Sequence, residues 1–517
     1  MREKFCLVSV SDKSSLELVL PVIKKHAFTL LSTGGTYEFI KKRGYEVISV
    51  DEYTSHPEIL EGRVKTLHPK IHGGILYKRE NETHKKTILD LNISPIDIVI
   101  VNLYPFKETI SKKNVAFEEA IENIDIGGPS LIRGAAKNFK SVCVLTNPDQ
   151  YEKFLEEIES NNGSTTFEYR KSLACEAFSF ISSYDSAIAS FLKPEEKLSD
   201  FPEKLELTLT KDLDLRYGEN PHQKAAFYTS NNNYFVDSFA KFKTLQGKQV
   251  SYNNIADSNA AWEIVQNFSL PSCAIIKHAN PSGVCTAKDL SRAYDKAFKC
   301  DPVSAFGGIY AFNKQVNGIV ADKLAETFVE VIIAPDFSSE ALNIFKNKPN
   351  VRLLKVDNHP KKDMLDFKKV NGGILLQTID DVENEFKNLK VVTKKHPDNA
   401  LLEDLKFAWY VCKYVKSNAI VFVKDQSTVA IGAGQMSRLD SVRIAEKKAI
   451  ENSLDLQGSV VASDAFFPFR DTVDEILKLG VSGIIHPGGS IKDEESIIAA
   501  NDKNIVMLNT GIRHFRH

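Results

Sequence analysis

Residues 274–285, AIIKHANPSGVC, are the stretch of the sequence that says most about the fold. The apolar run at 274–276 predicts a buried strand, and the turn-forming residues at 280–283 predict that a sharp turn ends it. Lys277 and His278 then lie at the carboxyl end of that strand, where parallel α/β sheets bind their ligands. An ammonium group beside an imidazole can move a proton while it stabilises a developing anion. The alternative is a solvated strand end with two incidental polar residues.

The bulk composition excludes several classes of protein. A chain of 517 residues is too long for one core, so several domains are expected, and 43% hydrophobic with 26% charged residues is typical of globular proteins. A net charge of -2 provides no basic field for nucleic acid or an acidic membrane. No apolar run reaches the roughly 20 residues of a membrane span, and the start lacks a signal-peptide pattern. The seven cysteines are scattered without a CxxC pair, which indicates reduced thiols and argues against a cysteine metal site.

An anion-binding pattern occurs near the start of the chain. Strands are predicted at residues 5–10 and 28–32, each followed by a helix, and the second strand runs directly into TGGT at 33–36. The glycines let backbone N–H groups approach an anion, and a helix N-terminus favours negative charge. Thr36 is expected to cap this helix and to touch a phosphate. The alternative is an ordinary tight turn, because the pattern matches neither a P-loop nor the dinucleotide fingerprint.

A basic segment follows at residues 62–74, GRVKTLHPKIHGG. Pro69 disfavours a helix, so we predict a loop whose cations suit a phosphate or a carboxamide oxygen. His68 and His72 are four residues apart, but without a helix they do not share a face, which disfavours zinc. The alternative is a solvated basic loop.

Two further polar segments complete the first third. A strand at 97–101 ends in Asn-Leu-Tyr-Pro, and DIGGP at 125–129 leads into a helix that carries Arg133 and Lys137 one turn apart. Pro129 is expected at the first helical position. Both basic residues have the alternative of being ordinary surface residues.

A long helix and a boundary are expected next. The helix at 167–192 has apolar residues at helical spacing, which favours a core or subunit-interface role over a site. The polar, proline-marked stretch at 193–203 is predicted to be a domain boundary.

The last part of the sequence contains a second α/β pattern, which starts near residues 416–421. The strand-and-turn segment at 483–490 resembles 275–283, which suggests a duplicated subdomain. The aromatic cluster at 465–471 fits either a core or a flat heteroaromatic ligand between its flanking charges.

Motifs spread over the whole chain resemble one family. SVSDK, STGGT, GRVKTLHPKIHGGIL, VNLYPF and ENIDIGGPSLIRGAAKN resemble the inosine monophosphate (IMP) cyclohydrolase domain. LRYGENPHQ, IIKHANPSG, DPVSAFGGIYAFN, KSNAIV, AIGAGQMSR, SDAFFPFRD and IRHFRH resemble the AICAR transformylase domain. In this order they are similar to the bifunctional enzymes that perform the last two steps of purine biosynthesis to IMP.

The resemblance implies an α/β fold. An N-terminal methylglyoxal synthase-like (Rossmann-like) domain over residues 1–198 is followed by a transformylase domain over 199–517. The latter consists of two cytidine deaminase-like α/β subdomains that divide near 370–400. The deaminase zinc signature is absent from the sequence, so this fold brings no zinc chemistry with it. The family is homodimeric, with transformylase sites built across the dimer interface.

The resemblance also implies the chemistry. The C-terminal part would transfer formyl from 10-formyltetrahydrofolate to the 5-amino group of AICAR, and the N-terminal part would close formyl-AICAR to IMP with loss of water. No catalytic metal is required, although the family allows a structural potassium ion. The implied partners are these small molecules and a second copy of the chain, with no nucleic acid and no membrane, in the cytoplasm.

For formyl transfer, the resemblance makes His278 the base, and Lys277 suits the oxyanion. Position 330 is Glu where some members carry Asp, so its reach differs. The residues expected to hold AICAR are Arg216, Tyr217, Gly307, Glu330, Asn418 and Arg513. Those expected near the folate are Arg438, Phe466, Asp471, Ser490 and Ile491.

For ring closure, the resemblance assigns Lys137 as proton donor, surrounded by Lys65, Tyr104 and Asp125. The matching nucleotide contacts are Ser11, Asp12, Lys13, Thr33, Gly34, Gly35, Thr36, Arg63, Thr66 and Asn102. Three rival functions are a nucleotide-sensing module, a methylglyoxal synthase and a non-enzymatic scaffold. The joint presence of the four ring-closure residues disfavours the nucleotide-sensing module. The long C-terminal part disfavours the methylglyoxal synthase, and Lys277 with His278 disfavours the scaffold.

Overall fold

A computed structural model describes residues 3–112, 115–192, 201–205, 207–230, 239–357, 365–380 and 385–517. The chain divides into two compact units, Met1–Glu206 and Leu207–His517, which are described separately here. Most of the predicted boundary at 193–203 lies outside the described residues. The domain limits 1–198 and 199–517 therefore stay a prediction.

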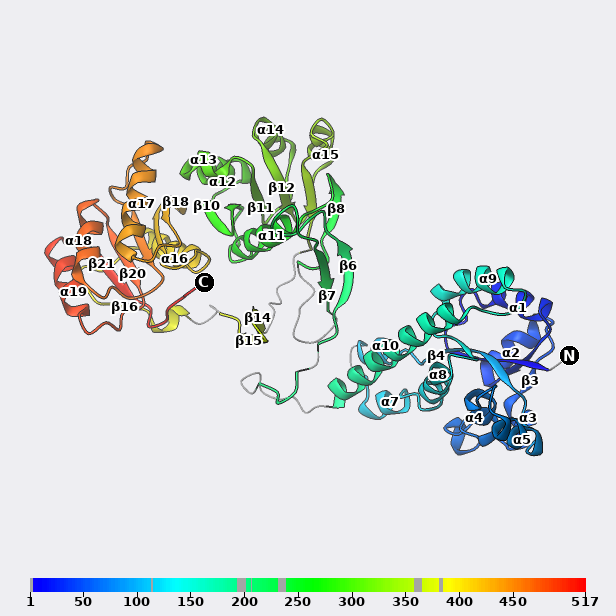
Figure 1. Cartoon of the computed structure of the whole chain (residues 1–517). Coiled ribbons are helices and arrows are strands. Elements are labelled where there is room, and N and C mark those ends of the chain that lie inside the picture. Colours follow the sequence, from blue (N-terminus) through cyan, green and yellow to red (C-terminus); the bar gives the residue numbers. More distant parts are fainter. Residues whose placement is uncertain are drawn as a thin grey trace. The chain divides into compact units, whose positions relative to one another are not determined.

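Unit 1 is built on a parallel sheet with the strand order β3-β2-β1-β4-β5 (Figure 1). The central strand β1 is buried on both faces because apolar residues fill it almost without interruption. Parallel pairing brings the carboxyl ends of the strands to one edge. The strands are β1 Lys4–Val10, β2 Phe28–Ser32, β3 Ile48–Ser49, β4 Ile96–Asn102 and β5 Cys143–Leu145.

Helices cover this sheet, and the long α10 packs against α8 and β5. Apolar side chains of α1, α8, α9 and α10 join the strands in one core. The helices are α1 Leu16–Lys25, α2 Gly34–Lys42, α3 Val50–Thr54, α4 Pro69–Leu76, α5 Glu82–Asp90, α6 Phe106–Ile110, α7 Phe117–Glu122, α8 Gly127–Lys137, α9 Tyr151–Ser160 and α10 Phe167–Leu192, with 3-10 turns η1 Leu60–Gly62 and η2 Pro148–Gln150.

Unit 2 is built on a mixed sheet of 12 strands that consists of two similar halves. Repeat 1, residues 243–355, contains β8 Lys243–Gln246, α11 Tyr252–Val265, β9 Ser272–Lys277, β10 Asn280–Thr286, α12 Leu290–Cys300, α13 Pro302–Ala305, β11 Gly308–Phe312, α14 Gly318–Glu326, β12 Val329–Ala334, α15 Ser339–Phe345 and β13 Arg352–Lys355.

Repeat 2, residues 390–509, has the same order of elements without a counterpart of the short α13. It contains β16 Lys390–Val391, α16 Asn399–Cys412, β17 Ile420–Lys424, β18 Ser427–Gly432, α17 Arg438–Glu451, β19 Val460–Ser463, α18 Arg470–Lys478, β20 Gly483–His486, α19 Asp493–Asp502 and β21 Val506–Asn509. Outside the repeats lie two small hairpins and a 3-10 turn: β6 Thr210–Asp214 with β7 Ala226–Thr229, β14 Leu365–Val370 with β15 Gly373–Thr378, and η3 Glu385–Asn388.

The two repeats meet at the antiparallel pair β10 and β18, in the middle of the sheet. Thr286 N–H donates to the Gln426 carbonyl at 3.0 Å, and Thr428 Oγ1 accepts from Val284 N–H at 2.9 Å. From this seam outward, both halves place their strands in matching order (Figure 1). The sheet is therefore an internal duplication about its central seam.

Helices cover both faces of the mixed sheet. α11 and α16 share one core that spans both repeats. On the other face, α12, α14 and α15 close the core of repeat 1, and α17, α18 and α19 close that of repeat 2. Alternate residues of β9 enter opposite cores, which explains why the strand is apolar throughout.

The hairpin at the start of repeat 1 differs from the sequence prediction. Residues 280–283 were expected to form a turn, but they begin strand β10, which pairs with β9. The turn itself is His278–Ala279, where φ is 54° and 59°. The sheet is also not parallel here, because β9 pairs antiparallel with β10 and with β11. Lys277 and His278 thus lie at the amino ends of β11 and β12 rather than among carboxyl ends.

The predicted internal similarity was right in kind but paired the wrong strands. The segment 483–490 contains β20, whose counterpart in repeat 1 is β12. The counterpart of the β9–β10 hairpin is β17–β18. The error arose because a buried strand followed by glycine and proline describes several strands of one α/β sheet equally well.

Candidate functional site

The carboxyl edge of the unit 1 sheet gathers the residues predicted to bind a nucleotide. Asn102, at the end of β4, holds the loop that follows β1. Its Oδ1 accepts the N–H groups of Ser11 at 2.6 Å and Asp12 at 2.9 Å, and its Nδ2 donates to the Asp12 carbonyl at 2.7 Å. The Asn102 amide therefore fixes the shape of the 11–13 loop.

The TGGT segment opens helix α2 with Thr33, not Thr36, at the N-cap position. Thr36 was predicted to cap the helix, and this is wrong, because it lies inside α2 and is only 4% exposed. Its Oγ1 donates to the Val10 carbonyl at 2.9 Å and accepts Val10 N–H at 3.1 Å. Thr33 Oγ1 lies 3.0 Å from Ser9 Oγ. The threonines thus bind the turn to β1.

Two ammonium groups flank the glycines of this turn. A Cβ atom added at Gly34 would lie 3.8 Å from Lys65 Nζ, and one added at Gly35 would lie 3.9 Å from Lys13 Nζ. Lys65 also pairs with Glu58 at 2.9 Å. A helix N-terminus, exposed glycine backbone and two cations together suit an anion such as a phosphate.

The basic segment 62–74 is only partly a loop. Pro69 was expected to prevent a helix, but helix α4 begins at Pro69, because proline is tolerated at the first helical position. His68 is the N-cap, and its Nδ1 accepts the Lys70 N–H at 3.1 Å. His72 lies inside α4, where burial lowers its pKa. Among the described residues, no group of three or more His, Cys, Asp or Glu could hold a metal ion.

Asp125 lies at the start of helix α8, near Tyr104. Its Oδ1 accepts the Gly128 N–H at 2.8 Å, and its own N–H donates to the Tyr184 hydroxyl at 2.9 Å. Burial raises the pKa of this carboxyl, while N–H groups of Gly128, Tyr104 and Gly127 lower it. Asp125 is thus a half-buried acid suited to proton transfer. Thr66 reaches the same turn, since a Cβ added at Gly127 would lie 2.9 Å from its Oγ1.

Lys137 does not lie beside Asp125 in this structure. It is the last residue of α8, which has 11 residues, so roughly 15 Å of helix separates it from the first residue, Gly127. Pro129 is the third residue of α8 and not the first, as predicted, because the helix already begins at Gly127. Arg63 forms an ion pair with Glu122.

The amino edge of repeat 1 carries the residues predicted to transfer formyl. Lys277 Nζ donates to the carbonyls of Phe306 at 3.1 Å and Gly307 at 3.0 Å. Gly307 has φ of 68° and donates its N–H to the Phe328 carbonyl at 2.7 Å. His278 is exposed in the adjoining turn. The lysine is therefore fixed and the imidazole is accessible.

Glu330 joins a charged cluster at the same edge. Its Oε2 accepts from Asn254 Nδ2 at 3.1 Å and lies 3.6 Å from Arg352 Nη1. Burial lowers the pKa of Arg352, Glu330 raises it, and the positive charge of Arg216 lowers it. Two arginines so close favour an anion between or beside them. Tyr217 follows Arg216, whose guanidinium lies 5.4 Å from the tyrosine ring.

Repeat 2 presents the remaining predicted residues. The Lys416 N–H donates to Asn280 Oδ1 at 2.9 Å, which brings residues 416–418 next to the turn that carries His278. Asn418 Nδ2 donates to the carbonyls of Gln435 at 2.9 Å and Met436 at 3.1 Å. The segment around Asn418 therefore lies close to the His278 turn within one chain.

Arg438 forms a buried ion pair with Asp464. Arg438 Nη2 lies 2.8 Å from Asp464 Oδ1, with side chains 9% and 0% exposed. Ser417 Oγ donates to the other carboxylate oxygen at 2.5 Å. Arg438 is thus held rigidly, whereas the other folate candidates and Arg513 are more open.

Of the aromatic cluster, Phe467 is core and Phe466 is 38% exposed. Phe466, Asp471, Ile491 and Arg513 are exposed, and Ser490 is half-buried.

His486 lies buried behind this ion pair. Burial and the Arg438 charge lower its pKa to about 3. In the unfolded chain a histidine binds a proton near pH 6.5, so between pH 6.5 and 3 the unfolded state binds more protons. We expect unit 2 to lose about 1.5–2 kcal/mol of stability as the pH falls from about 6.5 to 5. Urea unfolding at both pH values measures this loss.

The control for this pH effect is His486→Gln, which cannot titrate. Its amide oxygen can still accept the Gly488 N–H that donates to His486 Nδ1 at 3.2 Å. The variant should lose much less stability over the same pH interval. An equal loss in both proteins would contradict the assignment.

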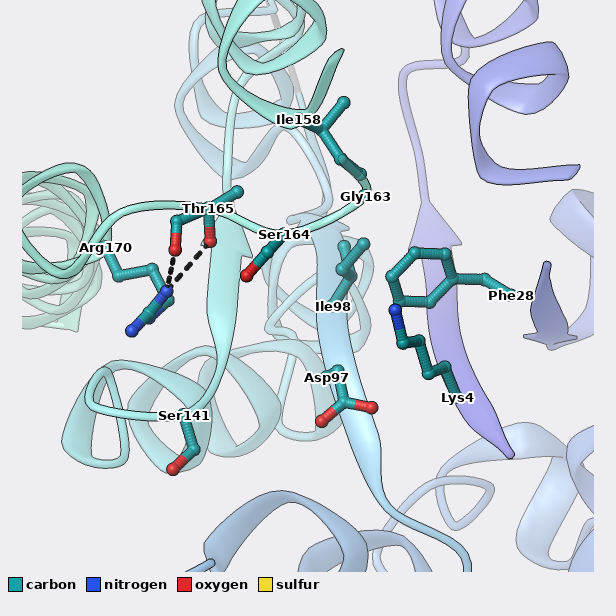
Figure 2. Close-up of a pocket in the computed structure, with 10 residues that line it drawn as sticks. All are labelled: Lys4, Phe28, Asp97, Ile98, Ser141, Ile158, Gly163, Ser164, Thr165 and Arg170. Carbon is teal, nitrogen blue, oxygen red and sulfur yellow. Dashed lines mark hydrogen bonds between the residues drawn. The ribbon is translucent and has the colours of Figure 1, made fainter. Parts of the chain in front are cut away.

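A hollow of about 180 Å³ lies at the opposite, amino edge of the unit 1 sheet (Figure 2). Arg170 borders it, but its guanidinium donates to the carbonyls of Phe139 at 2.8 Å and Lys140 at 2.8 Å, and also to that of Thr165. Asp97 pairs with Arg79 at 3.3 Å. None of the predicted site residues lines this hollow. We assign no ligand to it.

Sequence reasoning missed several residues that shape the site. Asp257 accepts the Ala279 N–H at 2.8 Å, and Asn254 and Arg352 bind Glu330. Asp464, which binds Arg438, lies in the quoted SDAFFPFRD motif and was not singled out. No local sequence pattern marks these residues, and their roles become visible only from the side chains and backbone groups that they contact in the fold.

Two protein-family models match this chain and identify the class of protein to which it belongs. A sequence model of the MGS-like domain matches residues 18–130, so unit 1 contains a methylglyoxal synthase-like α/β domain. A model of the AICARFT/IMPCHase bienzyme family matches residues 135–448, more than half of the chain. The chain belongs to the AICARFT/IMPCHase bienzyme family of purine biosynthesis. Among the described residues, no helix is long and apolar enough to cross a membrane.

One solved structure, titled "Crystal structure of ForH", is similar to part of the chain. It is 33% identical, with a TM-score of 0.34, and the match covers 36% of this chain and 95% of that one.

Proposed function

We propose that unit 2 transfers a formyl group from 10-formyltetrahydrofolate to the 5-amino group of AICAR, and that unit 1 closes formyl-AICAR to IMP with loss of water. Membership of the bienzyme family supports both activities. The observation that carries the first is the exposed His278 beside Lys277, whose ammonium is fixed 3.0 Å from the Gly307 carbonyl.

The proposed transfer needs a base and an oxyanion donor. The AICAR amine is a poor nucleophile because its lone pair is delocalised, so His278 removes its proton as the new N–C bond forms. An ammonium has three N–H groups, and Lys277 uses two on backbone carbonyls, which leaves the third for the developing oxyanion. The bond between the formyl carbon and the folate N10 then breaks, and N10 takes the proton.

The AICAR and folate contacts are proposals that rest on the family resemblance. Arg216 lies near Arg352, and both suit the AICAR phosphate. Tyr217, Gly307, Glu330, Asn418 and Arg513 complete the proposed AICAR set, and Arg438, Phe466, Asp471, Ser490 and Ile491 the proposed folate set.

Ring closure is proposed at the carboxyl edge of unit 1. The carboxamide nitrogen attacks the formyl carbon within one molecule, so positioning and proton transfer account for most of the acceleration. Lys13 and the backbone of the TGGT turn would hold the phosphate, with Lys65, Tyr104 and Asp125 at the reacting end. Lys137 is retained as proton donor on the resemblance.

Lys137→Ala tests that assignment. Loss of a general acid typically costs about 10²–10⁴ in rate, so ring closure should fall by that factor while formyl transfer is unchanged. Conversion of supplied formyl-AICAR to IMP measures the first activity. Lys140→Ala, an exposed lysine just beyond α8, is the matched control. Unchanged ring closure in Lys137→Ala would show that another group donates the proton.

Further properties are proposed with the function. These are a homodimer, a cytoplasmic location, the domain limits 1–198 and 199–517, and a cytidine deaminase-like fold for each repeat. A structural potassium ion would need oxygen ligands, and Asp464 offers a buried carboxylate, although Arg438 already balances its charge. No step of the proposed chemistry depends on that ion.

The decisive experiment incubates the purified chain with AICAR and 10-formyltetrahydrofolate and identifies the products by mass spectrometry. IMP would support both activities, and accumulated formyl-AICAR would support only the first. If neither appears and supplied formyl-AICAR is also unchanged, the chain is a nucleotide-binding module and the proposal is wrong.

A further inference from the structure

The two repeats of unit 2 share an unusual turn. The β9–β10 turn, His278–Ala279, has φ values of 54° and 59°, and the β17–β18 turn, Asp425–Gln426, has 51° and 54°. Two-residue turns with both φ values positive fit the twist of a hairpin, and they favour Asn, Asp or Gly first with Gly second. The second residues here are Ala279 and Gln426 instead of glycine, so each turn needs outside support.

An aspartate from the preceding helix supports each turn. In repeat 1, Asp257 of α11 accepts the Ala279 N–H at 2.8 Å. In repeat 2, Asp404 of α16 accepts the N–H groups of Asp425 at 2.9 Å and Gln426 at 2.8 Å. The two aspartates occupy equivalent places in the duplicated fold.

A lysine clamp is duplicated as well. Lys277 binds the Phe306 and Gly307 carbonyls, and Lys424 binds the Gln457 carbonyl at 2.9 Å. A glycine with positive φ lies at or just after the bound carbonyls in each repeat, Gly307 in repeat 1 and Gly458 in repeat 2. Gly307 N–H donates to the Phe328 carbonyl, and Gly458 N–H donates to the Gly480 carbonyl at 2.8 Å. Repeat 2 therefore retains the scaffold around the turn.

The two turns differ in the residue that they present. Repeat 1 presents His278, and repeat 2 presents Asp425 in the same place. The carboxylate of Asp425, whose backbone N–H binds Asp404, is not the imidazole to which the chemistry of repeat 1 is assigned. Asp257 beside His278 instead places an anion next to a group that becomes cationic when it takes a proton.

We propose that Asp257 is a positioning residue for formyl transfer: its carboxylate fixes the left-handed turn that presents His278 and provides the counter-charge for the protonated imidazole. The inference rests on the proposed function of unit 2. Burial raises the pKa of Asp257, while the Ala279 N–H and the charges of His278 and Lys277 lower it, which indicates that the carboxylate senses both groups.

Charged groups approach this turn from both repeats. Asp257 lies on α11 and Lys277 on β9, and the charges of Lys277 and His278 both lower the pKa of the Asp257 carboxyl. Repeat 2 brings Lys416, whose backbone N–H donates to Asn280 Oδ1 and whose ammonium donates to the His517 carbonyl at 2.7 Å. Asp257 thus brings an acidic group against this turn, on the same side as the ammonium of Lys277 that lowers its pKa.

Asp257→Asn separates the two roles, because its amide oxygen can still accept the Ala279 N–H. We expect kcat for formyl transfer to fall by about 10-fold with an unchanged KM for AICAR. Asp257→Ala also frees the turn and should cost about 100-fold.

Asp404→Asn and Asp404→Ala are the matched controls. They remove the same kind of bond from the turn of repeat 2, which carries no proposed catalytic residue. We expect both to retain wild-type kcat, with losses of melting temperature similar to those of the Asp257 variants.

The outcomes separate this inference from the proposed function. A wild-type chain without formyl transfer overturns the proposed function and the inference with it. An active wild type with an Asp257→Asn variant of unchanged kcat overturns only the inference. Equal activity losses in the Asp257 and Asp404 variants, in step with melting temperature, would also overturn it, since the carboxylates would then be structural alone. Ring closure of supplied formyl-AICAR confirms in each sample that unit 1 is intact.

Discussion

Replacing His278 with alanine is expected to reduce formyl transfer by about 10²–10⁴ and to leave ring closure unchanged. The imidazole is exposed in a two-residue turn, so its removal leaves no cavity in the core. Alanine also tolerates the turn as the neighbouring Ala279 does, with φ of 59°. Formyl-AICAR production from AICAR and 10-formyltetrahydrofolate measures the loss.

The control for this variant is His396→Ala, an exposed histidine outside the regular elements of repeat 2. It should transfer formyl at the wild-type rate. Should His278→Ala lose both activities while remaining folded, the assignment of the two reactions to separate units would be wrong.

Alanine at Gly283 or Gly432 is expected to destabilise unit 2 by at least about 3 kcal/mol, which lowers Tm on the order of 5–10 °C. A Cβ at Gly283 would lie 1.9 Å from the Ala297 carbonyl oxygen, and one at Gly432 would lie 1.9 Å from that of Ser441. Both obstacles are helix backbone and cannot rotate away. Each glycine lets a seam strand touch the helix of its own repeat. Thermal unfolding of the full chain measures both effects.

Gly373→Ala is the matched control, because the nearest atom to its added Cβ is a valine methyl at 3.8 Å. Its stability should change by less than about 0.5 kcal/mol. If Gly283→Ala melted like Gly373→Ala, the close packing of β10 against α12 would be refuted.

Much of the fold could be predicted from the sequence because buried strands of α/β sheets read as apolar runs. Residues 28–32 and 167–192 were predicted with the bounds that the structure shows for β2 and α10. The errors lie mainly at turns and helix ends, where local signals allow several structures or tertiary contacts override them. The turn falls at His278–Ala279 because Asp257 supports a backbone that these residues disfavour alone.

Site residues that belong to a local sequence motif could be predicted. Site residues that come together only in the folded chain could not. TGGT indicated an anion site, and Lys13 and Lys65 are found beside its glycines. Asp257 and Asp404 have no local signal, since an aspartate on a half-exposed helix face is commonplace. Their equivalence appears only when the two halves of the sheet are matched strand by strand.

The duplicated sheet has a consequence for the ancestry of unit 2. Its halves join through one antiparallel pair of edge strands, β10 and β18, an arrangement that two identical half-length chains could form as a symmetric dimer. After two such chains are fused, only one of the two copies needs to keep its catalytic residues. The histidine would then be kept in one turn, while its counterpart drifted to Asp425 and the second half specialised in presenting residues to the first. Unit 2 thus has the architecture of a gene duplication, and the proposed reaction would assign the chemistry to one copy and its support to the other.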